Sequence, residues 1–197
     1  MHLYTSEAGW PEFEPLACYL GAEASLLATD SGGQSFDEAH SLLWWQLQRA
    51  LPASKPLAAG TFAVTVECRG QRDVSYEIAQ QDADAVIDYL TLRQSIRGVA
   101  RRLPELPMPA TPLAGSEQLY APASGILVHR AQVGAHVRIG DPLFDIVDPL
   151  TDQTTTIVSK SDGVFYMRRA VRFVTTGAAL GRVTGTHPVR GGPLLSA

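Results

Sequence analysis

The alternation of hydrophobic and polar positions divides this chain into two parts. In roughly the first hundred residues, apolar positions recur at helical spacing in some segments and form short strand-like runs in others. From residue 119 onward, short apolar runs stand between glycine-centred turns, a pattern typical of compact all-β modules. We therefore expect an α/β part that mixes helices with strands, followed by a part made almost wholly of strands.

The first part carries the signals of three helices and two strands. The pattern predicts helices over residues 11–20, 35–51 and 82–97, and strands over 25–29 and 61–68. Gly21 and Gly98 are placed to end the first and third helices, because glycine accepts the left-handed backbone of a helix C-terminus. Alternating strands and helices are typical of a sheet covered by helices, but this part is too short for a complete doubly wound domain.

The helix expected over 35–51 carries two further signals. Ser35 and Glu38 have the spacing of a capping box. Trp44 and Trp45 are adjacent, so they point about 100° apart and cannot both face one core. We expect one to pack inside and the other to lie in an exposed apolar patch that another part of the protein, or another subunit, would cover. The apolar positions on one face of this helix are Ala39, Leu42, Leu43, Leu47 and Ala50.

A proline-rich stretch separates the two parts. Residues 103–116 read LPELPMPATPLAGS, and proline removes backbone donors and favours extended geometry in the residue before it. We expect a semi-rigid linker. The predicted organisation is an α/β part over 1–102, a linker over 103–118, an all-β domain over 119–186 and a tail over 187–197.

The second part consists of two similar halves, 119–147 and 155–185, each with a glycine before an apolar pair and a later glycine before a closing strand. It resembles the barrel-sandwich hybrid fold of biotinyl and lipoyl carrier domains, in which the hairpin between the halves carries a modified lysine. Here that hairpin, 148–154, has no lysine, and Lys160 lies farther along the chain. We therefore do not expect a carrier, which would show as a mass increase on Lys160 or Lys55.

Charge and composition exclude several other classes. The formal net charge of −4 over 197 residues argues against a dedicated nucleic-acid binder, which needs a clustered basic face. No run approaches the roughly 20 apolar residues that span a bilayer, and the first residues do not read as a signal peptide. Two cysteines, Cys18 and Cys68, do not make a disulfide framework, so we expect free thiols and a cytoplasmic location.

Three segments, in a fixed order, resemble one enzyme family. Residues Thr65–Gly70 read TVECRG and match a T-x-E-x-x-G motif, which a helix, the proline-rich linker and the β module then follow. The opening MHLYT and the segment SGGQSFDEAHSLLWW match earlier parts of the same order. Over essentially its whole length the chain resembles the C-terminal portion of the succinylglutamate desuccinylase/aspartoacylase family, whose catalytic domain resembles zinc carboxypeptidases. The implied fold is a partial α/β catalytic domain plus an all-β barrel-sandwich hybrid module.

The resemblance implies a hydrolase that removes the acyl group from an N-acyl amino acid. In the family a His-x-x-Glu pair and a later histidine bind zinc, which polarises the acyl carbonyl and activates a water. A separate glutamate accepts the proton of that water, and by motif match this residue is Glu67. Arg69 and Arg72 flank it and are candidates to bind a substrate carboxylate. A tyrosine of the C-terminal module reaches the substrate, and Tyr166 is the nearest match, with Phe165 as the alternative register.

The metal-binding motifs are missing from this sequence. The five histidines do not begin a His-x-x-Glu motif and do not stand at helical ligand spacing; they are His2, His40, His129, His136 and His187. His2 lies close to where the resemblance places the third ligand, and we expect it to line the site rather than to bind metal. We expect zinc in the complete enzyme, none in this chain alone, and no deacylase activity without the missing N-terminal half of the catalytic domain.

Several alternatives stay open. Glu67 can be a salt-bridged strand residue, with Arg69 or Arg72 as its partner, and Tyr166 a packing residue. The chain can also be a non-enzymatic binding or assembly protein that keeps the fold without the metal. A start codon placed too late, a shortened chain and a gene split into two polypeptides would each explain the missing half. The acyl group, the amino acid and the number of copies in a homo-oligomer are not specified by the sequence.

Overall fold

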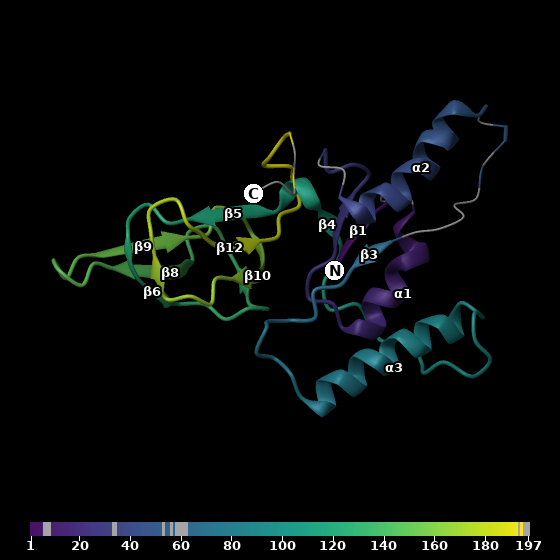
Figure 1. Cartoon of the computed structure of the whole chain (residues 1–197), viewed down its shortest axis with the longest axis horizontal. Helices are drawn as coiled ribbons and strands as arrows, with labels where there is room; N and C mark the ends of the chain where they lie inside the picture. The colour runs from purple at the N-terminus through teal and green to yellow at the C-terminus, as the bar shows by residue number, and fades with distance from the viewer. Residues whose placement is uncertain are drawn as a thin grey trace. The chain divides into compact units, whose positions relative to one another are not determined.

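The computed structural model describes residues 1–5, 9–32, 35–52, 54–55, 57, 63–192 and 194, without the side chains of His2, Tyr4 and Trp45. The chain forms two compact units (Figure 1). The first comprises Met1–Ala110 with the end of the chain from Gly192, and the second comprises Thr111–Gly191. The boundary thus falls inside the stretch 103–118 that the sequence marks as a linker.

The first unit mixes helices with a small sheet. Its strands are β1 (His2–Tyr4), β2 (Leu26–Ala28) and β3 (Val64–Thr65). Strand β1 lies between the other two, parallel to β2 and antiparallel to β3. The helices are α1 (Trp10–Leu20), α2 (Phe36–Ala50) and α3 (Tyr76–Leu92). The mixed helix and strand content predicted for this part is confirmed.

Helix α1 contacts the sheet on one side and α3 on another. Its Phe13 packs with Leu3 and Leu27 of the parallel strands. Its Leu16 and Tyr19 pack instead with buried residues of α3. Gly21 ends the helix in the left-handed conformation predicted for it, with φ 60° and ψ 41°, and its N–H bonds to carbonyl groups of the last turn.

Helix α3 and strand β3 differ from the predicted ranges. Helix α3 begins at Tyr76 rather than at 82, because the Ser75 hydroxyl caps it by accepting a hydrogen bond of 3.2 Å from the N–H of Ile78. It ends at Leu92 rather than at 97, and Gln94 just beyond has a positive φ of 59°. Strand β3 has two residues, and residues 61 and 62 of the predicted strand lie outside the described residues.

Helix α2 buries polar side chains and exposes apolar ones, the opposite of a usual surface helix. Its most buried residues are polar: Asp37, Glu38 and Ser41. The predicted capping box is wrong, since the Ser35 side chain makes no cap hydrogen bond and the Glu38 carboxylate binds Ser31 instead. The apolar positions of its predicted face are exposed or half-buried: Ala39, Leu42, Leu43, Leu47 and Ala50.

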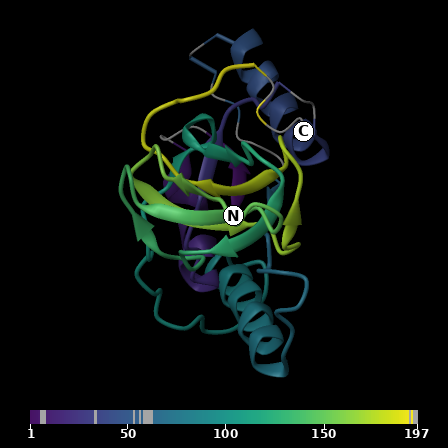
Figure 2. The ribbon, with the colours of Figure 1, turned by 90° about the vertical axis from the view of Figure 1, so that its left-hand side faces the viewer.

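The second unit is made almost wholly of strands (Figures 1 and 2). A short strand β4 (Thr111–Pro112) and a 3-10 turn at Leu113–Gly115 lead into it. Two four-stranded sheets follow, in the orders β5-β12-β10-β7 and β11-β6-β8-β9, and residues 111–191 form no closed barrel. The strands are β5 (Glu117–Tyr120), β6 (Gly125–His129), β7 (His136–Val137), β8 (Pro142–Val147), β9 (Thr154–Val158), β10 (Gly163–Arg168), β11 (Phe173–Val174) and β12 (Ala179–Val183).

The two sequence halves of this unit have equivalent places in it. Strand β6 pairs with β8 in the first half, and β10 pairs with β12 in the second. Every other pairing joins one half to the other: β5 with β12, β6 with β11, β7 with β10 and β8 with β9. The repeat seen in the sequence is therefore an interlocked pair of similar strand sets.

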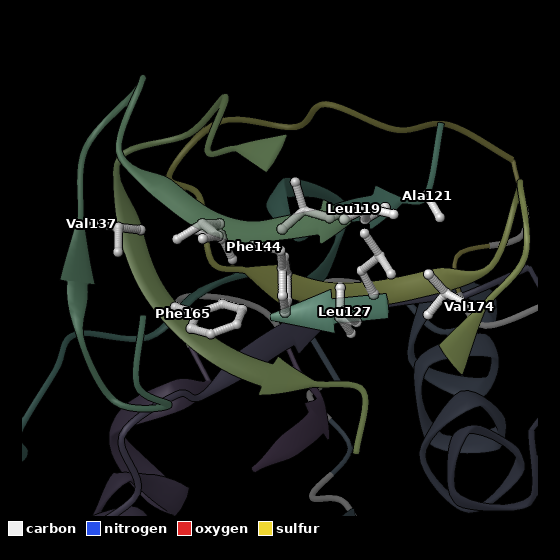
Figure 3. Close-up of a cluster of buried hydrophobic side chains, with 11 residues drawn as sticks. Leu119, Ala121, Leu127, Val137, Phe144, Phe165 and Val174 are labelled. Carbon is white, nitrogen blue, oxygen red and sulfur yellow. The ribbon is translucent and has the colours of Figure 1, made fainter. Parts of the chain in front are cut away.

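One apolar core lies between the two sheets. Figure 3 shows side chains from both sheets gathered in a single cluster, among them Leu119 and Phe165 from one sheet and Leu127 and Phe144 from the other. The rings of Phe144 and Phe165 meet edge to face, with centroids 5.5 Å apart and an interplanar angle of 81°. Both rings are fully buried.

Candidate functional site

The motif glutamate lies just past the end of strand β3. Glu67 follows Thr65 by two residues and its side chain is exposed. Glu67 lies near the Met1 amine, which directly precedes β1, because its carboxylate interacts electrostatically with that amine. Burial lowers the pKa of the Met1 amine, and the negative charge of Glu67 partly offsets this shift. In the backbone register His2 stands directly opposite Thr65, while the His2 side chain lies outside the description. The backbone thus brings the positions of Glu67 and His2 close together, at one end of the small sheet.

A buried carboxylate of α2 holds the residue that precedes this glutamate in the motif. The hydroxyl of Thr65 donates a hydrogen bond of 2.6 Å to Oδ2 of Asp37. The other oxygen of Asp37 accepts the backbone N–H of Glu38 at 3.0 Å. Asp37 is 4% exposed, so the bond is shielded from water. The carboxylate ties the first turn of α2 to the strand that leads to Glu67.

The neighbouring buried carboxylate serves the loop before α2. Oε1 of Glu38 accepts the N–H of Ser31 at 3.1 Å, and Oε2 accepts the Ser31 hydroxyl at 2.5 Å. The sequence identifies neither this role nor that of Asp37. Acidic residues in the first turn of a helix are ordinary companions of the helix dipole, and only the fold shows that these two turn inward.

Arg69 has a strong partner on α3. Its guanidinium donates two hydrogen bonds to the Asp82 carboxylate, at 2.8 Å and 3.0 Å. These bonds are the main cause of a raised pKa for Arg69. The backbone of Arg69 has a φ of 70°, in the left-handed region that non-glycine residues rarely adopt. Arg72, the other candidate for a substrate carboxylate, is exposed.

A shallow cleft of about 340 Å³ lies beside Arg69 in the first unit. Tyr19, Arg101 and Asp82 are among its lining residues, and Glu67 is not. Arg101 is itself paired with Asp88, whose pKa is lowered mainly by hydrogen bonds from the Arg101 backbone and side chain. Because both arginines of this cleft already hold carboxylates, the cleft does not assemble the predicted acyl-substrate site around Glu67.

The candidate tyrosine lies in the second unit. Tyr166 is half-buried on β10, and its hydroxyl lies 2.6 Å from the hydroxyl of Ser116. Phe165, the alternative to Tyr166 in the sequence match, is completely buried in the core, so its side chain is not accessible to a substrate. The pKa of Arg190 is lowered, mainly by burial and to a lesser extent by the nearby charge of Arg182. Tyr166 and Tyr120 act in the opposite direction and raise that pKa. The Tyr166 hydroxyl therefore has the Ser116 hydroxyl as its hydrogen-bond partner, with Arg190 among the charged residues nearby.

The residues that the structure describes contain no group of three His, Cys, Asp or Glu side chains arranged to hold a metal ion. His129 is half-buried and its Nε2 lies 2.9 Å from the carbonyl oxygen of Arg169, so this nitrogen carries the proton. Cys18 and Cys68 are free thiols, the first buried and the second exposed. No helix in the described ranges is both long and apolar enough to cross a membrane.

Comparisons with known proteins found relatives among solved structures. No family model matches the chain, and no curated protein sequence matches it. A succinylglutamate desuccinylase/aspartoacylase family protein from Shewanella amazonensis superposes with a TM-score of 0.77 and 26% identity, over 93% of this chain and 50% of the other. A protein of the same description from Shewanella frigidimarina gives 0.77 and 23%, over the same shares of the two chains.

A third structure extends the match in fold alone. The product-bound ectoine utilization protein EutE from Ruegeria pomeroyi superposes with a TM-score of 0.69 at 16% identity, over 94% of this chain and 52% of that one. The chain thus spans about half the length of the solved proteins that it matches.

Proposed function

We propose a function from the premise that this chain belongs to the succinylglutamate desuccinylase/aspartoacylase family, of whose solved members it spans about half. The chain is the C-terminal part of a zinc-dependent amidohydrolase that removes the acyl group from an N-acyl amino acid. The observation that carries this proposal is the superposition of 93% of the chain on a family protein at 26% identity. The motif residues Thr65–Gly70 at the end of the sheet agree with it.

Glu67 is the proton acceptor in this proposal. Its carboxylate takes a proton from the water that attacks the acyl carbonyl and passes it to the nitrogen of the departing amino acid. An exposed side chain just past the end of a strand is accessible to a substrate, and the bond between Asp37 and Thr65 fixes the strand before it. The buried carboxylate of Asp37 acts through the backbone and is a positioning residue.

Binding of the substrate carboxylate falls to the cationic residues near Glu67. Arg72 is exposed and is the simpler candidate. Arg69 would have to exchange part of its bidentate contact with Asp82 for the substrate. The hydroxyl of Tyr166 is the candidate contact from the second unit, and His2 is the candidate beside Thr65. The substrate is a small N-acyl amino acid.

Zinc does not fit the described residues of this chain, which offer no metal-holding group. The family resemblance implies a His-x-x-Glu pair and a further histidine as ligands, and we assign these to the remaining half of the catalytic domain. When bound there, zinc would polarise the acyl carbonyl. The chain described here supplies the proton acceptor and substrate contacts.

Co-expression with the polypeptide encoded directly upstream of Met1 tests this proposal. We expect the purified pair to contain zinc and to release the free amino acid from an N-acetyl or N-succinyl amino acid. Replacing Glu67 by glutamine should lower kcat by about 100- to 10,000-fold with zinc still bound, because the proton acceptor is lost. The exposed Glu105→Gln variant is the matched control and should keep full activity.

Two results would contradict the proposal. A Glu67→Gln pair with undiminished kcat would remove Glu67 from the chemistry. A pair that assembles without zinc and hydrolyses no N-acyl amino acid would favour the alternative function, a binding or assembly protein that keeps the fold without the metal.

A further inference from the structure

Helix α2 carries its apolar residues on the side that faces solvent. The exposed fractions are 79% for Phe36, 53% for Leu43 and 42% for Leu47, and Leu51 directly after the helix is 39% exposed. These four residues form what we call the α2 stripe. Their separations of seven, four and four positions place them on one side of a helix. Leu43, Leu47 and Leu51 follow one another at one-turn intervals, while the exposed His40 stands between Leu43 and Phe36.

The opposite side of α2 is fixed in place by polar contacts. Asp37 and Glu38 are 4% and 1% exposed and bind Thr65 and Ser31. These contacts join the first turn of the helix to the rest of the first unit, and Figure 1 shows α2 extending beyond strands β1 and β3. Because the inward side is anchored, the helix cannot simply roll over to bury the α2 stripe. The α2 stripe therefore stays exposed to solvent in the described part of the chain.

The comparisons indicate a candidate for what covers the α2 stripe. The solved family proteins contain about as much chain again as the part that this protein matches. The small sheet also has an open edge at β3, which has β1 on one side and no described strand on the other. An exposed apolar helix face and an open sheet edge are both surfaces to which a further part of a protein can bind.

We propose that the α2 stripe is the docking surface for the other half of the family's catalytic domain, which presents a complementary apolar surface. This rests on the proposed function insofar as the partner is the zinc-bearing half. A second copy of this chain is the competing occupant, and the experiment below distinguishes the two.

The test uses the full chain and the polypeptide encoded directly upstream of Met1, expressed with an affinity tag. The double variant Leu43→Lys/Leu47→Lys should bind that polypeptide at least tenfold more weakly than the unaltered chain, because two charges enter an apolar contact. Both residues are already exposed, so the variant should fold, which circular dichroism checks. The control Leu150→Lys/Val171→Lys changes two exposed apolar residues of the second unit and should bind normally.

Other outcomes overturn the proposal. Undiminished binding by the Leu43→Lys/Leu47→Lys chain would mean that the α2 stripe is not the docking surface. The absence of any upstream-encoded half that binds would do the same.

If the chain alone forms a dimer that the double variant abolishes, as light scattering would show, a second copy is the occupant. A Glu67→Gln chain that binds normally but is inactive separates docking from chemistry, and a wild-type pair that forms without deacylase activity refutes only the proposed function.

Discussion

At the scale of single residues, two buried carboxylates in the first turn of α2 attach the helix to its surroundings, Asp37 to the motif strand and Glu38 to the loop before α2. A buried charge is costly unless hydrogen bonds replace its lost water, and both groups meet this condition. Asp37 accepts from Thr65 and from the helix backbone, while Glu38 accepts twice from Ser31. The polar side of α2 therefore functions as its attachment to the first unit.

Replacing Asp37 by alanine should destabilise the first unit by about 1–3 kcal/mol, because the hydroxyl of the half-buried Thr65 loses its acceptor. Asp37→Asn retains an acceptor oxygen and should cost less. Urea unfolding of the two variants measures the difference, with the exposed Glu77→Ala as a control that should change little. Equal stability of the alanine and asparagine variants would show that the bond to Thr65 contributes nothing.

His129 should make the second unit less stable as the pH falls. Burial is the main reason that its pKa lies below the ordinary value of 6.5, and the bond to the Arg169 carbonyl only partly offsets it. The unfolded chain therefore takes up a proton first. Stability is complete above pH 6.5 and declines as the pH drops from 6.5 toward the lowered pKa of the folded state.

Urea midpoints at pH 7.5 and 5.5 check this expectation. His129→Gln should flatten the difference between the two midpoints, and the exposed His136→Gln should leave it unchanged. Asp145 does not interfere, because its pKa is lowered from 3.8, chiefly by Arg130, and it titrates below this window. The same midpoint at both pH values in the unaltered chain would contradict the assignment.

At the scale of elements, the second unit depends on close contacts between neighbouring strands. Strand β10 begins at Gly163, beside Thr184 just after β12. A Cβ at position 163 would lie 2.0 Å from the carbonyl oxygen of Thr184, a backbone atom that cannot move aside. The small residue predicted as part of the repeat is thus required by the approach of two chain segments.

Gly163→Ala should consequently lower the stability of the second unit by about 1–3 kcal/mol or more, the usual cost of overfilling a packed site. Thermal unfolding followed by circular dichroism measures it. Gly191→Ala is the matched control, because a Cβ there meets no atom within 4 Å. If both variants unfold at the temperature of the unaltered chain, the strands can separate enough to accept a methyl group.

At the scale of the whole molecule, the chain has half the length of its solved relatives and an exposed apolar helix face. The described residues hold no cluster that would bind a metal. The described chain consists of a unit of helices and a small sheet together with a separate unit made almost wholly of strands.

The isolated chain should therefore carry far less than one zinc ion per molecule after mild dialysis. Elemental analysis by mass spectrometry measures this, and the co-expressed pair is the positive control. One tightly bound zinc per isolated chain would show that ligands exist outside the described groups. His2 would then be the first residue to replace.

The sequence by itself determined the elements whose signals are local. Periodicity and Gly21 located α1, and the spacing of glycines revealed the two equivalent halves of the β unit. The motif at Thr65–Gly70 pointed to the family that the superpositions support. It also located the candidate Glu67, whose role awaits the activity test.

Only the tertiary structure decided which side of α2 is covered and which partners the charged residues have. Periodicity identifies the faces of a helix but not which of them contacts the rest of the unit. The sequence therefore did not show that the apolar side of α2 faces solvent. Thr65 and Asp37 are 28 positions apart, and Arg69 and Asp82 are 13 apart. Contacts of this kind depend on how the chain returns to itself, and no local pattern of residues encodes that.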